Sequence, residues 1–497
     1  MVAGCLAVEA LPALAEKWTV ETSLGVQETA TNNVNLTPSD IRQSDLITQI
    51  TPTLRVNEQG AHTSLNGFVS VPLMIYARTG SQNNQVYPTV NLLGTVEFFD
   101  KFFNIDGSVA VAQQFFNPFG AQPASLDNPT ANRYQTETYT ISPYIRGTTP
   151  GNIKYEFRNT NSWTNLSGAP NAAADSRYTQ WTGTVSRKEA TLGWDASFDI
   201  TNIDFENQNP IRTRLVRLSP LYDIDPQLRL TASAGYEWNE YSLTESNNAI
   251  YGVGFEWRPT PRTQVSGNWE HRFFGSSYKF LFDHRTPLSV WSVNISRGIS
   301  TYPQQLALLP SGVPLSGLLN SLFLGSIPDP LDRQRAVDQF LQNRGLPQTL
   351  TSPVNIYAQQ ILLQNQQQVT VGLLGVRNSV FITAFNLQSE QITGSGEVLP
   401  PAFALGNDIR QTGVNAVWTH NLSSTLVLTA NVGGYRSVSK APFDLATNQG
   451  NANIMLTSSL SPNTKAMVGA RYQGLRADTG SDYNEVAAFV GLTHWFR

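Results

Sequence analysis

Residues 228–239 read LRLTASAGYEWN, and this stretch decides the fold class. Apolar and aromatic side chains occupy every second position from Leu228 to Trp238, and hydrophilic ones such as Arg229 and Glu237 occupy most positions between them. Successive side chains of a β-strand point to opposite faces, so one face of this strand is apolar and the other is wet. Alternation over about ten residues is the length and pattern of a tilted strand that crosses a bilayer.

The same pattern recurs along the rest of the chain and predicts about 22 strands, within a range of roughly 20 to 24. The connections alternate between short turns, such as 57–60 and 461–464, and longer polar loops, such as 28–44 and 115–135. Outer-membrane barrels have short turns at the periplasmic rim and long loops at the outer rim. The sequence therefore predicts an all-β, antiparallel transmembrane barrel over residues 16–497, located in the bacterial outer membrane with both termini in the periplasm.

The composition agrees with such a barrel. Charged residues make up 14% of the 497 residues, against about 25% in an average soluble domain, and neutral polar residues fill the difference. No apolar run of about 18 residues occurs, so a spanning helix is not predicted. The net charge of −4 argues against a nucleic-acid partner. A soluble β-protein remains the alternative, but it has no reason to sort its loops by parity.

Aromatic residues and the C-terminus favour the membrane interpretation. The chain ends in Trp495-Phe496-Arg497, which resembles the sorting signal read by the outer-membrane insertion machinery. We therefore expect that machinery and outer-membrane lipid as partners of a monomeric barrel. Six tryptophans fall near predicted strand ends, where aromatic girdles lie at headgroup level: Trp18, Trp163, Trp238, Trp257, Trp418 and Trp495.

Residues 1–15 resemble the end of an export signal, with small residues at Ala13 and Ala15. No basic residue precedes Lys17, which is what a truncated signal would give. Residues 2–5 also resemble a lipoprotein cleavage box, so a lipid anchor on Cys5 stays open as an alternative. A single cysteine excludes a disulfide framework and a cysteine-based metal site.

Residues 301–366 break the strand rhythm. Leucines and Phe323 at helical spacing predict one helix, and Asp329-Pro330 begins a second that ends near Gly345. Strand parity places this two-helix insertion after the fifteenth strand, at the outer rim. It is either a folded surface loop or a plug or lid that packs inside the barrel mouth through the apolar side chains Leu331, Val337, Phe340 and Leu341.

The sequence predicts no catalytic residue, metal site or cofactor, and we expect the protein not to be an enzyme. The five histidines are scattered over separate strands and turns. Asp283-His284 resembles a dyad, but adjacent residues of a strand point to opposite faces.

Charged residues fall mostly on the strand face opposite the apolar one, which is the lumen face of a barrel. Arginine binds planar oxyanions bidentately, so an anionic polysaccharide is one expected partner. The alternative is that Arg–carboxylate pairs stiffen a wide barrel. The candidate lumen-facing residues are Lys154, Glu156, Arg158, Glu237, Glu256, Arg258, Glu270 and Arg272. One long loop, 115–135, contains Asn117-Pro118-Phe119-Gly120, loosely similar to the constriction loop of diffusion porins.

Three stretches together resemble a known family. They are residues 284–293 (HRTPLSVWSV), the helix 329–347 with its VDQFL core, and residues 368–390 with GVRN at 375–378. The chain resembles the outer-membrane proteins associated with PEP-CTERM/exosortase systems. The resemblance implies an outer-membrane barrel linked to export or assembly of extracellular polysaccharide, and it implies no catalytic residues.

These observations lead to one expectation and two alternatives. We expect a conduit or scaffold for exopolysaccharide export. A passive diffusion porin and a structural or adhesive surface protein are the alternatives.

Overall fold

The computed structural model describes the chain from residue 17 to 496 with gaps. The described residues are 17–99, 101–168, 175–189, 191–206, 209–241, 244–307, 361–392, 408–440, 444–478 and 482–496, together with short pieces at 313–314, 319–320, 323, 327, 333, 336–337, 340–341 and 349–350. The expected signal peptide, 1–15, and the anchor candidate Cys5 lie outside them.

A single antiparallel sheet closes on itself. It contains 24 labelled strands, and β1 (Lys17–Thr31) pairs with both β2 (Asp45–Gln59) and β26 (Tyr483–Phe496). β3 and β4 both pair with β2 and form one position of the ring, and the short β5 leads into β6 in the next, so 24 − 2 gives 22 positions. The predicted 22-stranded barrel is confirmed, and its closure leaves no strand edge with unpaired backbone groups.

The remaining strands of the first half are β3 (Thr63–Ser70), β4 (Leu73–Tyr76), β5 (Gln85–Val86), β6 (Thr89–Phe98), β7 (Phe103–Phe115), β8 (Arg133–Thr148), β9 (Ile153–Ser167), β10 (Ser176–Lys188), β11 (Leu192–Phe205), β12 (Ile211–Asp223) and β13 (Leu228–Tyr241). Those of the second half are β14 (Thr244–Thr260), β15 (Thr263–Arg272), β16 (Gly275–Arg285), β17 (Ser289–Ser300), β18 (Val313–Pro314), β19 (Thr349–Leu350), β20 (Leu362–Leu374), β21 (Asn378–Gln391), β22 (Asp408–Asn421), β23 (Leu426–Ser439), β24 (Ala446–Ser461) and β25 (Thr464–Ala477).

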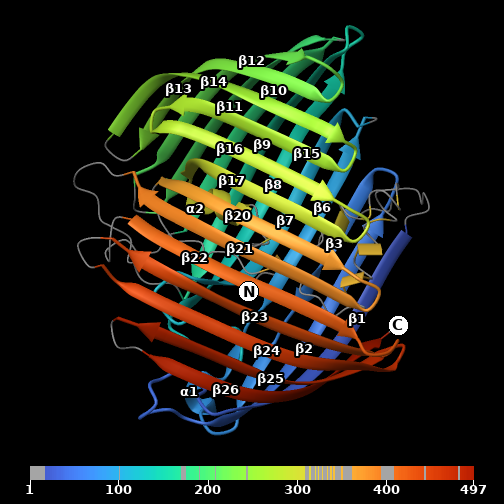
Figure 1. Ribbon diagram of the computed structural model, residues 1–497, viewed down its shortest axis with the longest axis vertical. Helices are drawn as coiled ribbons and strands as arrows, with labels where there is room; N and C mark the ends of the chain where they lie inside the picture. Colours follow the sequence, from blue (N-terminus) through green and yellow to red (C-terminus); the bar gives the residue numbers. More distant parts are fainter. Residues whose placement is uncertain are drawn as a thin grey trace, which may run out of the picture.

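Two helices are described from end to end, α1 (Gly80–Asn83) and α2 (Tyr302–Ala307). None of the helices in the described part of the chain is long and apolar enough to cross a membrane. In Figure 1 the strands β17 and β20–β26 form the wall nearest the viewer, and β2 and β6–β9 cross behind it with the opposite tilt. The two walls enclose a lumen.

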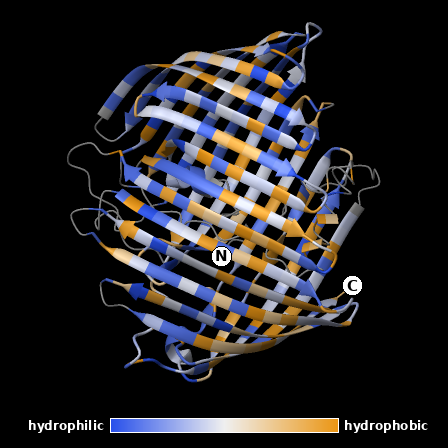
Figure 2. Cartoon of the chain, in the orientation of Figure 1, coloured by the Kyte–Doolittle hydropathy of each residue, from blue (hydrophilic) through white to orange (hydrophobic). Residues whose placement is uncertain are grey.

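Period-two alternation separates the two faces of the sheet. On β26, Val486, Val490 and Leu492 are exposed on the outer face, whereas Glu485 and Ala487 are buried on the inner face. Figure 2 shows the result as orange and blue bands that alternate along the strands. Because an exposed apolar belt encircles a sheet without edges, the barrel is suited to span a bilayer.

Loop length follows parity less strictly than expected. The first and last described residues, Lys17 and Phe496, lie at the end of the barrel that carries the short turns, which is where the termini were predicted. However, β13 to β14 and β15 to β16 are joined at the other rim by only two residues each, and β11 to β12 and β25 to β26 by five each. The connections after β1, β7, β17 and β21 are the long ones, and the outer rim is low over β11–β16.

The insertion follows β17, which is the fifteenth position of the ring, as parity predicted. Its expected end at residue 366 is wrong, because β20 begins at Leu362 and pairs with β17 up to Ser300. Polar residues 364–368 obscured this strand start in the sequence. The predicted girdle position of Trp495 is wrong. Leu492 and Phe496 are exposed on the outer face, so Trp495, which is adjacent to Phe496, lies on the lumen face, with the ammonium of Lys465 over its ring.

Candidate functional site

The lumen is the candidate site, and most of the predicted lumen-facing charges lie in it as pairs. The side chain of Glu237 is fully buried and lies 2.6 Å from the guanidinium of Arg272 on β15. Its other oxygen accepts a hydrogen bond from the backbone N–H of Phe273 at 2.7 Å. Glu270 pairs with Arg217 of β12 at 2.7 Å in the same region. These charges join β12, β13 and β15 from inside the barrel.

Two further groups of charged residues lie closer to the periplasmic rim. Arg158 on β9 pairs with Asp106 at 2.6 Å and with Glu156 at 3.3 Å, and its guanidinium lies 3.7 Å from the ring centre of Tyr144. Lys154 is exposed on the same face, closer to the periplasmic turn.

The predicted residues Glu256 and Arg258 lie at the periplasmic rim. They are hydrogen-bonded to one another, and Glu256 also pairs with Arg229 at 3.6 Å. Arg158, Arg258 and Arg272 therefore each have a carboxylate partner. This arrangement favours the interpretation that these arginines stiffen the wall over the one in which they bind an anion.

The insertion crosses the lumen directly after β17. Its first helix, α2, contacts β8 and β10 on the opposite wall. The hydroxyl groups of Tyr302 on α2 and Tyr134 on β8 are hydrogen-bonded, and both side chains are buried. A helix that begins on one wall and is bonded to the other divides the outer mouth.

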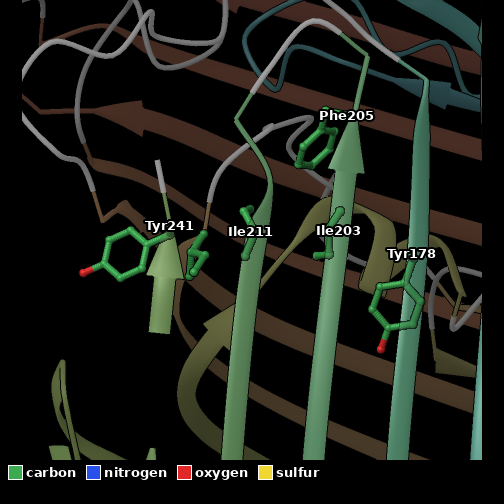
Figure 3. Packing of buried hydrophobic residues seen from close by; sticks show 6 residues of the cluster. Tyr178, Ile203, Phe205, Ile211 and Tyr241 are labelled. Carbon is green, nitrogen blue, oxygen red and sulfur yellow. The ribbon is translucent and has the colours of Figure 1, made fainter. Parts of the chain in front are cut away.

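The end of the insertion packs into an apolar cluster at the same height. Tyr178, Ile203, Phe205, Ile211 and Tyr241 gather at the outer ends of β10–β13, as Figure 3 shows. Ile361, the residue before β20, is buried among them. Both ends of the insertion are thus held at the outer mouth.

The middle of the insertion lies near the opposite end of the barrel. Val337 and Leu341 are buried against Phe381 of β21 and Val417 of β22, and Phe340 packs on the same cluster. Phe381 lies three residues from the start of β21 at the short turn 375–377, which marks the periplasmic rim. Gly372 on β20 provides space for the Phe381 ring, since a Cβ there would come within 2.7 Å of it.

The structure thus places three of the four predicted plug residues inside the lumen. Leu331 lies outside the described residues. Leu319 and Phe323 belong to the same cluster, and they come from the first of the two expected helices. The described residues of the insertion therefore lie both at the outer mouth and beside the periplasmic third of β20–β22.

A second segment, the loop 116–132 between β7 and β8, also enters the barrel. Gln449 on β24 accepts a hydrogen bond from the backbone N–H of Gln122 and donates one to the carbonyl of Gly120. The backbone N–H of Ala124 donates to Gln473 on β25 at 2.8 Å. This is the loop that resembles a porin constriction loop in sequence, and it lies against the inner wall of β23–β26.

A buried ion cluster holds this loop in place. Arg471 of β25 pairs with Asp127 of the loop at 3.0 Å and with Glu485 of β26 at 2.9 Å. The three side chains are at most 4% exposed. Asn128 and Gln473 complete the cluster with hydrogen bonds to Glu485. The sequence did not predict this ion cluster. Its two carboxylates are 344 and 14 residues from Arg471, and the alternation within a single strand does not indicate which charged residues meet.

The loop is attached to the neighbouring wall as well. Its Leu126 packs on an apolar cluster at the outer ends of β1–β4 that includes Val34, Ile47 and Met74. The hydroxyl of Tyr76 donates to the carbonyl oxygen of Asp127 at 2.9 Å. The loop thus bridges β7/β8 to β24–β26 across the outer mouth.

The described residues contain no group of three His, Cys, Asp or Glu side chains that could hold a metal ion. The Asp283-His284 pair does not form a dyad. His284 accepts or donates a hydrogen bond with Thr263 at 2.9 Å and stacks on Phe282, on the opposite face from Asp283.

The closed ring, its exposed apolar belt and its wet interior make this protein an outer-membrane β-barrel.

No protein-family model matches the chain, and no curated protein matches it either. Among solved structures, the siderophore receptor PiuA from Acinetobacter baumannii is 9% identical with a TM-score of 0.46, covering 96% of this chain and 82% of that one. The siderophore receptor PirA from Pseudomonas aeruginosa is 9% identical with a TM-score of 0.40, covering 96% and 80%. OpdK from Pseudomonas aeruginosa, solved with vanillate, is 7% identical with a TM-score of 0.35, covering 96% and 99%.

Proposed function

We propose that the barrel is a conduit for surface polysaccharide whose resting state is closed by the insertion. The observation that carries this proposal is the course of the insertion. It is bonded to the far wall at the outer mouth and packs on Phe381 and Val417 close to the periplasmic rim. A segment with residues packed near both ends of the lumen is expected to block ions until it moves.

The polysaccharide part of the proposal rests on the resemblance to PEP-CTERM/exosortase-associated proteins. Residues 284–293, the helix core at 337–341 and the turn 375–378 support it. An anionic polysaccharide stays a candidate, although the carboxylate partners of the lumenal arginines argue for structural roles. We further propose a monomer that reaches the membrane through the insertion machinery, with β26 as the recognised strand, and that performs no catalysis.

A passive diffusion porin is the second candidate, and one observation favours it. The loop 116–132 folds inward and is fixed to β25, which narrows the lumen as the constriction loop of a porin does. A porin would conduct ions steadily. A structural or adhesive protein would conduct none in any form.

Conductance in planar bilayers separates the three. We expect the intact barrel to conduct weakly and a variant with residues 305–350 replaced by a short Gly/Ser linker to conduct several-fold more, because the linker cannot fill the lumen. A matched variant that carries Ile382→Ala on the lipid face should conduct like the intact protein. High conductance in the intact barrel would favour the porin, and none in either form would favour the adhesin.

Deletion of the gene tests the cargo. The conduit hypothesis predicts that surface polysaccharide falls and that an intact copy restores it. Unchanged surface polysaccharide in the deletion strain would contradict the export role while leaving the gating result intact.

A further inference from the structure

A cavity of about 510 Å³ lies in the outer half of the lumen, beside the loop 116–132. It is bounded by β6 and β7 on one wall, by β22–β25 on the other, and by Gln122, Pro123 and Ala124 of the loop. Pockets that hold small organic ligands measure about 300–1,000 Å³. The cavity is therefore large enough for a short segment of a polymer.

The lining of this cavity differs from the rest of the lumen in charge. Among the described residues that line it, none is Lys, Arg, Asp, Glu or His, and nine of 25 are Asn or Gln. Two guanidinium groups lie beside the lining: those of Arg55 and Arg133 are each 5.7 Å from the ring centre of a lining residue, Phe68 and Phe115 respectively. By contrast, the opposite part of the lumen carries the ion pairs of Arg217 and Arg272.

Some of the amides hold the loop, and others are available. Gln122, Gln449 and Gln473 are hydrogen-bonded within the loop contact, and the hydroxyl of Tyr435 donates to Gln122 at 2.5 Å. The side chains of Asn91, Gln114 and Asn451 make no hydrogen bond to another residue of the described part of the chain. These three come from β6, β7 and β24, so the available amides lie on both walls.

Aromatic rings supply the apolar part of the lining. Phe385 of β21, Tyr435 of β23 and Tyr483 of β26 all border the cavity. Gly413 allows the Phe385 ring to lie flat against the wall, since a Cβ at this position would come within 2.6 Å of the ring. The cavity thus combines neutral hydrogen-bonding groups with ring faces.

This combination matches the chemistry of an uncharged sugar. Each amide presents a carbonyl acceptor beside an NH₂ donor, which complements two neighbouring hydroxyl groups that donate and accept. The C–H face of a pyranose is apolar and weakly positive, and it packs on the negative face of an aromatic ring. None of the described lining residues could serve as a cationic partner for a carboxylate or phosphate buried in this cavity, which makes an anionic ligand unfavourable.

We propose that this cavity binds a neutral glycan segment, with Asn91, Gln114 and Asn451 as hydrogen-bonding residues and Tyr435 as a stacking platform. The inference rests on the proposed function in naming a glycan as cargo, and it narrows that cargo to its uncharged members. It requires nothing about the direction of transport.

Calorimetric titration of the full-length barrel in detergent tests the proposal. The probes are a neutral gluco-oligosaccharide and an oligogalacturonate of equal length. The neutral probe should bind at least tenfold more tightly. Asn451→Leu and Asn91→Leu should each weaken it about tenfold, the loss expected for one neutral hydrogen bond.

The control is Asn268→Leu, because Asn268 is exposed on the lumen face of β15, among the paired charges and outside the cavity. It should bind the neutral probe like the parent protein. Circular dichroism of each variant confirms that the barrel is folded before binding is compared.

Tighter binding of the galacturonate, no binding of the neutral probe, or an equal loss in Asn268→Leu would each overturn the inference. These outcomes are distinct from failure of the proposed function. The glycan site stands if binding behaves as expected while deletion of residues 305–350 leaves conductance unchanged.

Discussion

Two segments enter this barrel from its outer rim, and different forces hold them. The loop 116–132 is held by Arg471, Asp127 and Glu485, three buried charges that need one another. The insertion is held by apolar contacts between Leu341 and Val337 on one side and Phe381 and Val417 on the other. The stability of a buried ion cluster depends on all of its members, because removal of one leaves a buried charge without a partner. Apolar packing is graded, because it loses free energy in proportion to the area and volume removed.

In the proposed conduit, this contrast identifies the insertion, and not the loop, as the segment that moves. The loop is fixed in one position by directional bonds on both of its flanks, so it defines a permanent constriction. The insertion is bonded at its ends and packed on apolar surface in its middle. Apolar contacts can separate and form again without leaving a buried charge unpaired, which suits a segment proposed to open and close the lumen.

The largest effect is expected from Arg471→Met. The variant leaves Asp127 and Glu485 buried without a cation, and the free energy that holds the loop should fall by about 3–5 kcal/mol. The loop then swings into water, and its cleavage by an added protease should rise by about two orders of magnitude.

Two controls sharpen this result. Arg476→Met, an exposed arginine on the same strand, should leave cleavage unchanged. Neutralising all three charges together, with Asp127→Asn and Glu485→Gln added, should restore much of the protection, because no unpaired charge remains. If Arg471→Met alone were as protected as the parent protein, the loop would not depend on the ion cluster.

A smaller effect is expected from Phe381→Ala, which leaves a cavity where the insertion is seated. Loss of a buried Phe costs about 3 kcal/mol, and the cost is shared between the wall and the insertion. We expect conductance to rise while the barrel stays folded. Phe381→Leu should change it little, since apolar replacements of similar volume are tolerated. If conductance rose equally in Phe381→Leu, the stability of this contact would not follow the volume of the side chain.

The smallest effect is expected from Tyr302→Phe, which removes the hydroxyl that α2 shares with Tyr134 on β8. One hydrogen bond contributes about 1 kcal/mol, so backbone hydrogen exchange in α2 should rise about fivefold. Tyr472→Phe, on the exposed outer face of β25, serves as the matched control and should leave exchange unchanged. Exchange that stays slow in Tyr302→Phe would show that α2 is held by packing alone.

Much of the fold was predictable because it depends on local information. Alternation such as that from Leu228 to Trp238 predicts a strand wherever it occurs, and loop parity then predicts the ring, its rim and the position of the insertion. The errors fall where alternation fails. Polar residues 364–368 hid the start of β20, and the short outer connections beside Tyr241 and Phe273 weakened the parity rule.

The site was predictable only in part, for a related reason. Alternation places Glu237, Glu270 and Arg272 on the lumen face, but it does not say which carboxylate meets which guanidinium. The loop carried a recognisable Asn-Pro-Phe-Gly pattern, yet nothing near it indicates the arginine that holds it. Partners that are hundreds of residues apart leave no mark on the local pattern of either strand.

The sequence by itself determined the strand pattern, the lipid-facing belt, the wet interior and the rim from which the long segments leave. Only the tertiary structure decided that Asp127 meets Arg471, that Tyr302 reaches Tyr134, and that neutral amides from β6, β7 and β24 surround one cavity. The physical reason is that periodicity sets the face on which a side chain lies, whereas closure of the ring sets what lies opposite it.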